Sequence, residues 1–204
     1  MTVITISREL GSGGDEIADI VCERLGYPRV DKDVLMEIAE EAGVDVDAVQ
    51  RLESSFTKRA RLVSGEMTSL YRKQASAFDQ PGAIDDRTYA QVLKETLTSF
   101  AGRDDVVIVG RGGQMVLRVW PGALHVCLSA PPETRAERIV QREALSAQQA
   151  LRLVERSDEQ KRQYIRHMHN NADWRNFKYY HLMIDTSRVS AATAGAMIVL
   201  AARA

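Results

Sequence analysis

The stretch ISRELGSGGDEIADIVCERLGY, residues 6–27, joins a strand pattern to a helix pattern through a turn rich in glycine. Residues 3–6 are mostly apolar and β-branched, as expected of a buried strand, and behind the turn apolar residues recur at helical spacing as far as Gly26. The glycines let the backbone turn back and aim several N–H groups inward, next to the positive end of the helix dipole. Such a turn favours a bound phosphate. The residues expected to hold it are Gly11, Ser12, Gly13 and Gly14.

This turn lacks the lysine and the serine or threonine that a phosphate-binding loop normally carries, and Asp15 and Glu16 stand near that place. Their negative charge opposes an anion unless a cation lies between them, and they could simply satisfy the helix dipole. A dinucleotide-binding turn is a second alternative, with Asp31 at the distance of a ribose-binding acid. Glu16 argues against it, because that fingerprint requires a small residue there.

Composition is that of an ordinary globular protein. The chain has 204 residues, 45% hydrophobic and 27% charged, which suits one domain over 1–204 with an inserted subdomain. A net charge of −1 gives no field that attracts nucleic acid or a membrane surface. The two cysteines lie in apolar stretches, and no signal peptide or long apolar run is visible, so we expect a reduced cytoplasmic protein that acts on small molecules.

Short apolar stretches alternate with helical patterns along the chain, which predicts an α/β protein with a parallel sheet covered on both faces. Ligands of such sheets bind at the carboxyl ends of the strands. The five expected strands are 2–7, 28–30, 106–109, 124–130 and 181–187. The expected helices are 14–26, 32–42, 87–101, 133–142, 147–168 and 190–203, with a further basic, helical segment at 44–80.

Two more segments carry charge toward the expected ligand edge. GRGG, residues 110–113, follows a buried strand, and Arg111 there suits bidentate binding of phosphate, although it could equally pair with a neighbouring carboxylate. In the long helix Arg152 and Arg156 lie one turn apart. Asp158 and Arg162 have the spacing of an ordinary i,i+4 ion pair, so this helix could also be a solvated charged face.

Together these segments resemble the cytidylate kinase-like family, within the P-loop nucleoside monophosphate kinases. The match rests on the order and spacing of six motifs rather than on one loop. They are ITISRELGSGGDEIA (4–18), LGYPRVDKDVL (25–35), VVIVGRGG (106–113), LHVCLSAPPETRAERI (124–139), ERSDEQKR (155–162) and MIDTS (183–187). The resemblance implies a three-layer P-loop kinase-like fold and magnesium-dependent transfer of a phosphoryl group from ATP to a nucleoside monophosphate.

The resemblance also implies roles for individual residues. Asp31, Lys32 and Arg111 would face the acceptor, and Thr186 and Ser187 would lie near the adenine. The segment 147–170 would be a lid over the donor. Its expected residues are Arg152, the acid Asp158, and the catalytic cations Arg156 and Arg162. The helical insertion 44–86 lies where such kinases carry a monophosphate-binding subdomain, and its helices at 44–73 would allow a homo-oligomer.

Four positions depart from the usual kinase pattern. Arg8 replaces the first loop glycine, Gly14 the lysine, Glu16 the magnesium-binding hydroxyl residue, and Gly112 an acid that often follows the Gly-Arg pair. We expect Arg8 to supply the missing charge and Glu16 to bind magnesium directly. The alternative is a non-catalytic nucleotide sensor or interaction module on the same fold.

Overall fold

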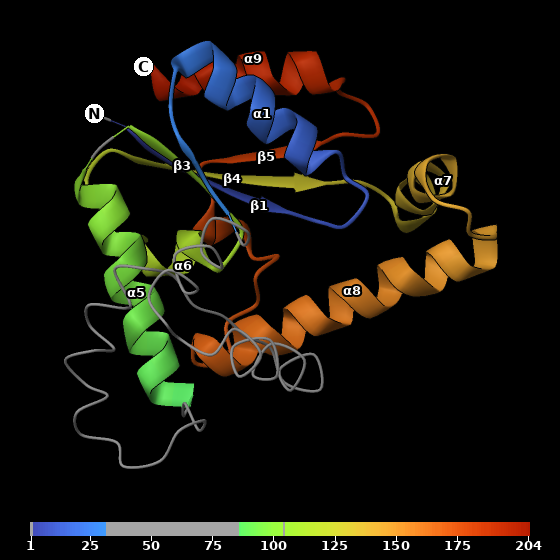
Figure 1. Ribbon diagram of the computed structural model, residues 1–204, viewed down its shortest axis with the longest axis horizontal. Coiled ribbons are helices and arrows are strands. Elements are labelled where there is room, and N and C mark those ends of the chain that lie inside the picture. Colours follow the sequence, from blue (N-terminus) through green and yellow to red (C-terminus); the bar gives the residue numbers. More distant parts are fainter. Residues whose placement is uncertain (1, 32–85, 104) are drawn as a thin grey trace.

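The computed structural model describes residues 2–31, 86–103 and 105–204, and its centre is a five-stranded parallel sheet (Figure 1). The strand order is β2-β3-β1-β4-β5, and every neighbouring pair is parallel. The strands are β1 (Val3–Arg8), β2 (Arg29–Val30), β3 (Val106–Val109), β4 (Ala123–Ser129) and β5 (Leu182–Asp185). All five expected strands are therefore confirmed, and the order places the end of β1 between the ends of β3 and β4.

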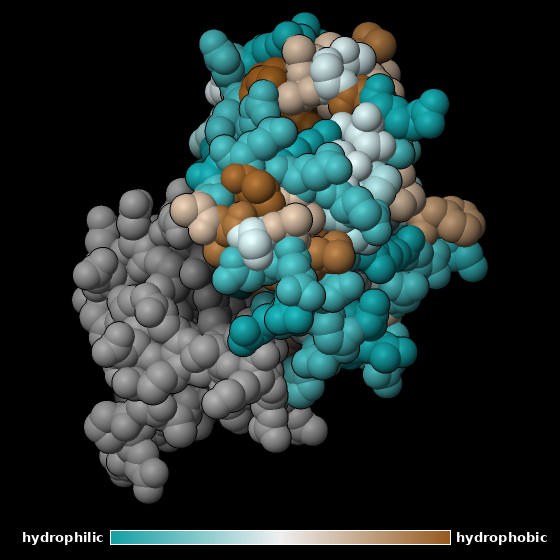
Figure 2. All heavy atoms as spheres, turned by 90° about the vertical axis from the view of Figure 1, so that its right-hand side faces the viewer, coloured by the Kyte–Doolittle hydropathy of each residue, from teal (hydrophilic) through white to brown (hydrophobic). Residues whose placement is uncertain are grey.

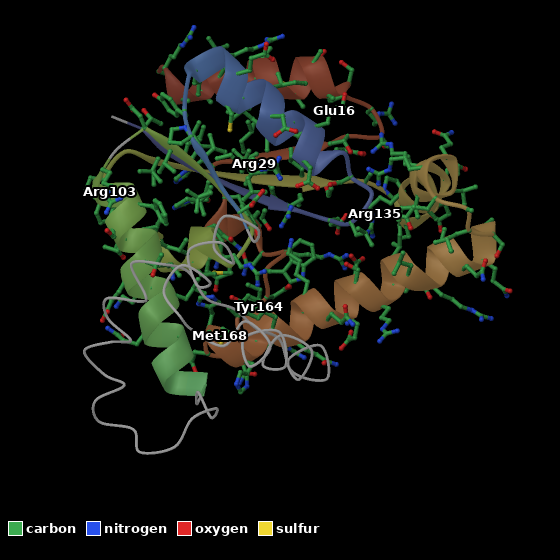
Figure 3. The ribbon with its side chains drawn as sticks, in the orientation of Figure 1. Glu16, Arg29, Arg103, Arg135, Tyr164 and Met168 are labelled. Atoms are coloured by element: carbon green, nitrogen blue, oxygen red, sulfur yellow. The ribbon has the colours of Figure 1, made fainter. Side chains whose placement is uncertain are left out.

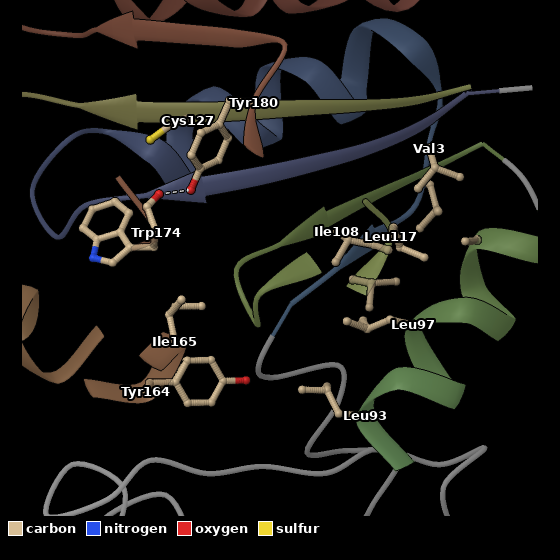
Figure 4. Packing of buried hydrophobic residues seen from close by; sticks show 13 residues of the cluster. Val3, Leu93, Leu97, Ile108, Leu117, Cys127, Tyr164, Ile165, Trp174 and Tyr180 are labelled. Atoms are coloured by element: carbon tan, nitrogen blue, oxygen red, sulfur yellow. Dashed lines mark hydrogen bonds between the residues drawn. The ribbon is translucent and has the colours of Figure 1, made fainter. Parts of the chain in front are cut away.

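Helices cover both faces of the sheet, which confirms the predicted three layers (Figure 1). One face is covered by α1 (Gly14–Leu25) and α9 (Ala191–Ala202). These two helices can approach closely because Gly195 has no side chain: a Cβ there would lie 2.5 Å from the Ile20 side chain. The other face is covered by α5 (Asp86–Gly102), α6 (Gly113–Val116) and the end of α8 (Ala147–Met168). Its core, shown in Figure 4, joins Leu93 and Leu97 to Trp174 and Tyr180.

A helical hairpin extends beyond the sheet. It consists of α7 (Pro132–Arg142) and the first half of α8, and its own small core contains Ala136, Ile139, Ala150 and Val154. Ser146 caps α8 with a complete capping box, in which its side chain accepts from the Gln149 backbone and the Gln149 side chain accepts from the Ser146 backbone. Figure 2 faces this end of the molecule and shows a mainly hydrophilic surface with small, separate hydrophobic groups.

Two elements were not predicted. The helix α6 has four residues and the 3₁₀ turn η1 (Phe177–Tyr179) has three, so neither is long enough to produce a periodic sequence pattern. The helices expected at 32–42 and 44–80, the insertion up to residue 85, and Lys32 lie outside the described residues. Within the described part, no helix is both long and apolar enough to cross a membrane.

Candidate active site

A cavity of about 660 Å³ opens at the carboxyl ends of β1 and β3, where parallel sheets bind their ligands. Its walls are the loop after β1, the turn Gly110–Gly112 after β3, and the middle of α8. The predicted site residues that line it are Arg8, Gly11, Gly13, Gly14, Glu16 and Arg111. The fold therefore gathers the first loop and the GRGG turn around one space.

The glycine loop is compact. Gly11 and Gly13 both have left-handed backbones, with φ of +80° and +74°. A side chain on Gly11 would also meet the Arg135 carbonyl at 2.6 Å, so α7 can pack directly on the loop. Ser12 is fully buried and its Oγ donates to the Glu9 carbonyl across 2.7 Å. This hydrogen bond stabilises the turn of the loop.

Arg8 fills the space that a side chain at position 14 would need. A Cβ on Gly14 would lie 2.4 Å from the Arg8 Cβ and 2.5 Å from its Cγ. The guanidinium then reaches the turn after β3, where a Cβ on Gly110 would meet Arg8 Nη1 at 2.4 Å. Burial lowers the pKa of Arg8, while Asp15 at 3.6 Å opposes that shift. Arg8, at the end of the strand, thus occupies the space beside position 14, where the loop lysine is missing.

The acids at the start of α1 are largely neutralised. Arg29 on β2 contacts three carboxylates: Asp15 at 2.9 Å, Asp19 at 2.6 Å and Asp31 at 2.7 Å. Asp15 also faces Arg8, so it does not act as an unpaired negative charge against a phosphate. Glu16 is exposed at the cavity and remains available for a cation. Arg29 was not anticipated, because a single arginine in a two-residue strand gives no pattern.

Lys161 brings a second cation to the loop from α8. Its Nζ donates to the Ser7 hydroxyl and to the Arg8 carbonyl, both across 2.9 Å, and lies 3.9 Å from the centre of the Trp174 ring. Burial lowers the pKa of the Lys161 ammonium to about 8. From the sequence, Lys161 is one of several cations in a charged helix, and only the packing of α8 on β1 distinguishes it.

Next to Lys161, four residues form an ion network, which consists of Glu9, Arg135, Asp158 and Arg175. Arg135 donates to both Asp158 carboxylate oxygens, at 3.0 and 2.7 Å, and lies 3.4 Å from Glu9. Arg175 contacts Glu9 and Asp158, each at 2.8 Å. In Figure 3, Arg135 lies between the loop after β1 and α8. The network therefore links the glycine loop, α7, α8 and the segment before η1.

Comparison of the whole chain with known proteins identifies a family. The model of the cytidylate kinase-like family matches residues 3–188. The chain belongs to this family. A curated relative, the cytidylate kinase of Methanopyrus kandleri, is 26% identical over 189 residues, covering 92% of this chain and 86% of that protein. The cytidylate kinase of Pyrococcus abyssi is 26% identical over 195 residues, with the same two coverages.

Solved structures share the fold of this cytidylate kinase-like chain. An uncharacterized protein from Eubacterium ventriosum has a TM-score of 0.64 at 20% identity, covering 100% of this chain and 99% of that one. The shikimate kinase of Bacteroides thetaiotaomicron has a TM-score of 0.50 at 9% identity, covering 100% and 99%. These likenesses show a P-loop kinase-like fold, and the family supports a kinase-type phosphotransferase.

The other described residues that the family resemblance suggested are not among those that line this cavity. Thr186 accepts from Arg138 through Oγ1 at 3.0 Å and through its carbonyl at 2.6 Å, and Ser187 donates to Asp185. Among the lid cations, Arg162 pairs with Glu159, while Arg152 and Arg156 are exposed on α8. Asp158 belongs to the ion network rather than pairing with Arg162.

Several residues of the site were missed from the sequence. Arg135 had a signal, because it shares a helical face with buried Ile139, where an arginine is rare unless it is paired. Glu9, at 6% exposure, had none beyond its place in the loop. Arg138 and Arg175 bind partners that are 48 and 166 residues away in sequence, which only the fold reveals.

Membership of this kinase family implies magnesium, and among the described residues one arrangement could bind it. No group of three or more metal-binding side chains occurs in the described ranges, so a site built from protein alone is not found there. Mg²⁺ commonly takes one or two carboxylates and completes its shell with water and phosphate oxygens. The exposed Glu16 at the cavity meets that requirement.

Proposed function

We propose that this protein transfers the terminal phosphoryl group of ATP to a nucleoside monophosphate, with Arg8 and Lys161 in place of the missing loop lysine. The observation that carries the proposal is their convergence. One cation arrives from the end of β1 and the other from α8, and both line the cavity that contains the glycine loop.

Phosphoryl transfer needs positioning and positive charge around the moving group, and little covalent help. The glycine loop would hold the donor phosphates through its N–H groups. Arg8 offers several N–H donors over Gly14, and Lys161 offers a compact ammonium beside it. Arg111 lies across the same cavity and would bind the phosphate of the acceptor. These groups are held in place before substrate arrives, so they can stabilise charge that develops during transfer.

Glu16 would hold magnesium together with the ATP phosphates, and the bound ion would neutralise charge between the β- and γ-phosphates. The carboxylate stands in the first turn of α1, beside the loop. Because Asp15 is occupied by Arg8 and Arg29, Glu16 is the acid of this turn that is assigned to the metal.

The acceptor assigned first is cytidylate, because the curated relatives that cover most of this chain are cytidylate kinases. Gly112 follows Arg111 in the acceptor turn, so this position offers no side chain to read a base. Specificity must then come from other residues, and related pyrimidine monophosphates belong in the same assay.

The test is ADP release from ATP with CMP, dCMP, UMP and AMP as acceptors, with and without Mg²⁺. Lys161→Ala should lower turnover, and Arg118→Ala, which removes an exposed arginine that stacks on Tyr179, serves as the matched control. Magnesium-dependent release that requires a nucleoside monophosphate supports the proposal. ATP binding without release for any acceptor would overturn it in favour of a nucleotide sensor.

A further inference from the structure

The segment between α8 and η1 carries two residues that contact the site: Trp174 lies against Lys161, and Arg175 binds Glu9 of the glycine loop. Trp174 is 1% exposed, and its carbonyl accepts from the Tyr180 hydroxyl across 2.7 Å (Figure 4). Tyr180 in turn accepts from Gln114 at 3.1 Å. The segment is therefore held in the core, so the Arg175 side chain extends from a firmly placed backbone.

Arg175 bridges two carboxylates that belong to different elements. Its Nε and Nη2 donate to Glu9 Oε1 at 3.2 and 2.8 Å, and Nη2 also contacts Asp158 Oδ2 at 2.8 Å. The carboxylates are nearly buried, with side chains 5% and 13% exposed, whereas Arg175 is 44% exposed. Two neighbouring carboxylates with little exposure to water repel each other, and the guanidinium that both contact offsets this repulsion and holds them in one arrangement.

The two acids stand next to the atoms that Lys161 joins. Glu9 follows Arg8, whose carbonyl accepts from Lys161, and Asp158 precedes Lys161 by three residues on α8. Arg175 thus bridges the loop and the helix close to the Lys161 contact: Glu9 is the residue after Arg8, and Asp158 lies within one helical turn of Lys161. The neighbouring Trp174 ring lies against the same ammonium.

We propose that Arg175 is a positioning residue for the phosphate site: by bridging Glu9 and Asp158, it holds α8 against the glycine loop and so fixes the Lys161 ammonium at the end of β1. The inference rests on the proposed function for its effect on turnover. It makes Arg175 act through Lys161, without contact to a substrate. Arg135 contributes to the same network, but its complete burial makes it a poor test, because removing its side chain would open a cavity in addition to breaking ion pairs.

The first measurement does not require turnover. Competitive labelling of lysines with acetic anhydride at graded pH, read by mass spectrometry, gives the pKa of Lys161 in each variant. Arg175→Ala should admit water and let that pKa rise from about 8 toward the ordinary 10.5. Binding of tripolyphosphate, measured by calorimetry, should weaken by about tenfold, since the ammonium loses its fixed position.

The second measurement is kinetic. Arg175→Ala should lower kcat/KM for ATP by about 10- to 100-fold, and Arg175→Lys should recover part of the loss because it keeps the charge without the fork of donors. The matched control Arg118→Ala should match the parent in all measurements. Circular dichroism and thermal unfolding confirm that each variant is folded.

The outcomes separate the two proposals. If the parent releases no ADP with any acceptor, the proposed function fails, and the Lys161 pKa and tripolyphosphate affinity still decide the role of Arg175. If the parent turns over, and Arg175→Ala matches Arg118→Ala in Lys161 pKa, tripolyphosphate affinity and kcat/KM, then Arg175 is a surface ion pair only and the inference is overturned.

Discussion

Lys161 Nζ donates a hydrogen bond to the carbonyl oxygen of Arg8 across 2.9 Å, which ties the middle of α8 to the end of β1. The ammonium is removed from water there, and burial lowers its pKa to about 8. Below that pH Lys161 carries a charge that can attract phosphate. As pH rises through about 8, the charge is lost.

This titration predicts an alkaline limb in kcat/KM for ATP, with an apparent pKa near 8, because that ratio reports groups of the free enzyme. Lys161→Arg should remove the limb, since a guanidinium stays charged throughout this range. A pH–rate profile of parent and variant measures both. An identical limb in Lys161→Arg would assign the titration to another group.

Arg8 and Gly14 should behave as one unit. Arg8→Ala should lower kcat/KM by about 10²- to 10³-fold, the usual loss of a donor that stabilises developing charge. Gly14→Lys alone should also be harmful, because its Cβ would lie 2.4 Å from the Arg8 Cβ. In the Arg8→Ala background the same Gly14→Lys change should recover activity, since the space is then free. A double-mutant cycle measures this, and simply additive losses would show that Arg8 does not replace the lysine.

Glu16→Gln should raise the Mg²⁺ concentration needed for half-maximal activity. The exposed carboxylate of Glu16 lines the cavity, while Asp15 is engaged by Arg8 and Arg29. A Mg²⁺ titration at fixed ATP provides the measurement, with Glu23→Gln on an exposed turn of the same helix as control. If the two variants titrate alike, Glu16 only satisfies the helix dipole.

The sequence predicted the sheet because its strands are short, apolar on both faces and separated by stretches with helical periodicity. Gly26 and Ser146 mark helix boundaries. Strand order could not be read in this way, since it depends on how helices pack. The glycine loop and the GRGG turn were also predictable, because backbone conformation requires glycine there. Lys161 and Arg175 were not singled out, because a charged residue in a polar helix or loop looks the same in the sequence whether it meets water or a distant partner. Lys161 binds the end of β1, and Arg175 binds a buried carboxylate 166 residues away.

Acid should destabilise the protein through two histidines. Burial, and then the charge of the stacked His181 ring with its centroid 5.0 Å away, together lower the pKa of His125 to about 4. Burial also lowers the pKa of His169 to about 4. The unfolded chain therefore binds more protons than the folded one between about pH 6.5 and 4. The stability contributed by each neutral histidine is complete above about pH 6.5 and is lost as pH falls toward 4.

His125→Asn isolates this effect. The loss of unfolding free energy between pH 6.5 and 4 should be smaller in the variant by up to about 3 kcal/mol, from 1.36 kcal/mol per pKa unit. The parent is expected to be more stable at pH 7, because His125 Nδ1 lies 2.8 Å from Thr5 Oγ1 in the core. Urea unfolding at several pH values gives both numbers. Parallel pH curves for the two proteins would exclude His125 as the titrating group.

The lid expected over 147–170 has a fixed point in this structure. Asp158 is bound to Arg135 and Arg175, whereas Arg152 and Arg156, six and two residues before it, are exposed. The first half of α8 packs mainly on α7, through a small core separate from the two cores of the sheet. A triphosphate would attract the exposed arginines, so any closing movement should involve the hairpin before Asp158.

Hydrogen exchange with and without ATP and a monophosphate tests this movement. Protection should rise in residues 150–157 and in the loop 7–14 together, because both contact the donor only when it is bound. Residues 191–202, in α9 on the opposite face, should not change and serve as an internal reference. Arg152→Ala combined with Arg156→Ala should abolish the gain in 150–157 while the loop still responds. If 150–157 is equally protected in the free protein, α8 is a rigid helix, and its arginines would then act from fixed positions.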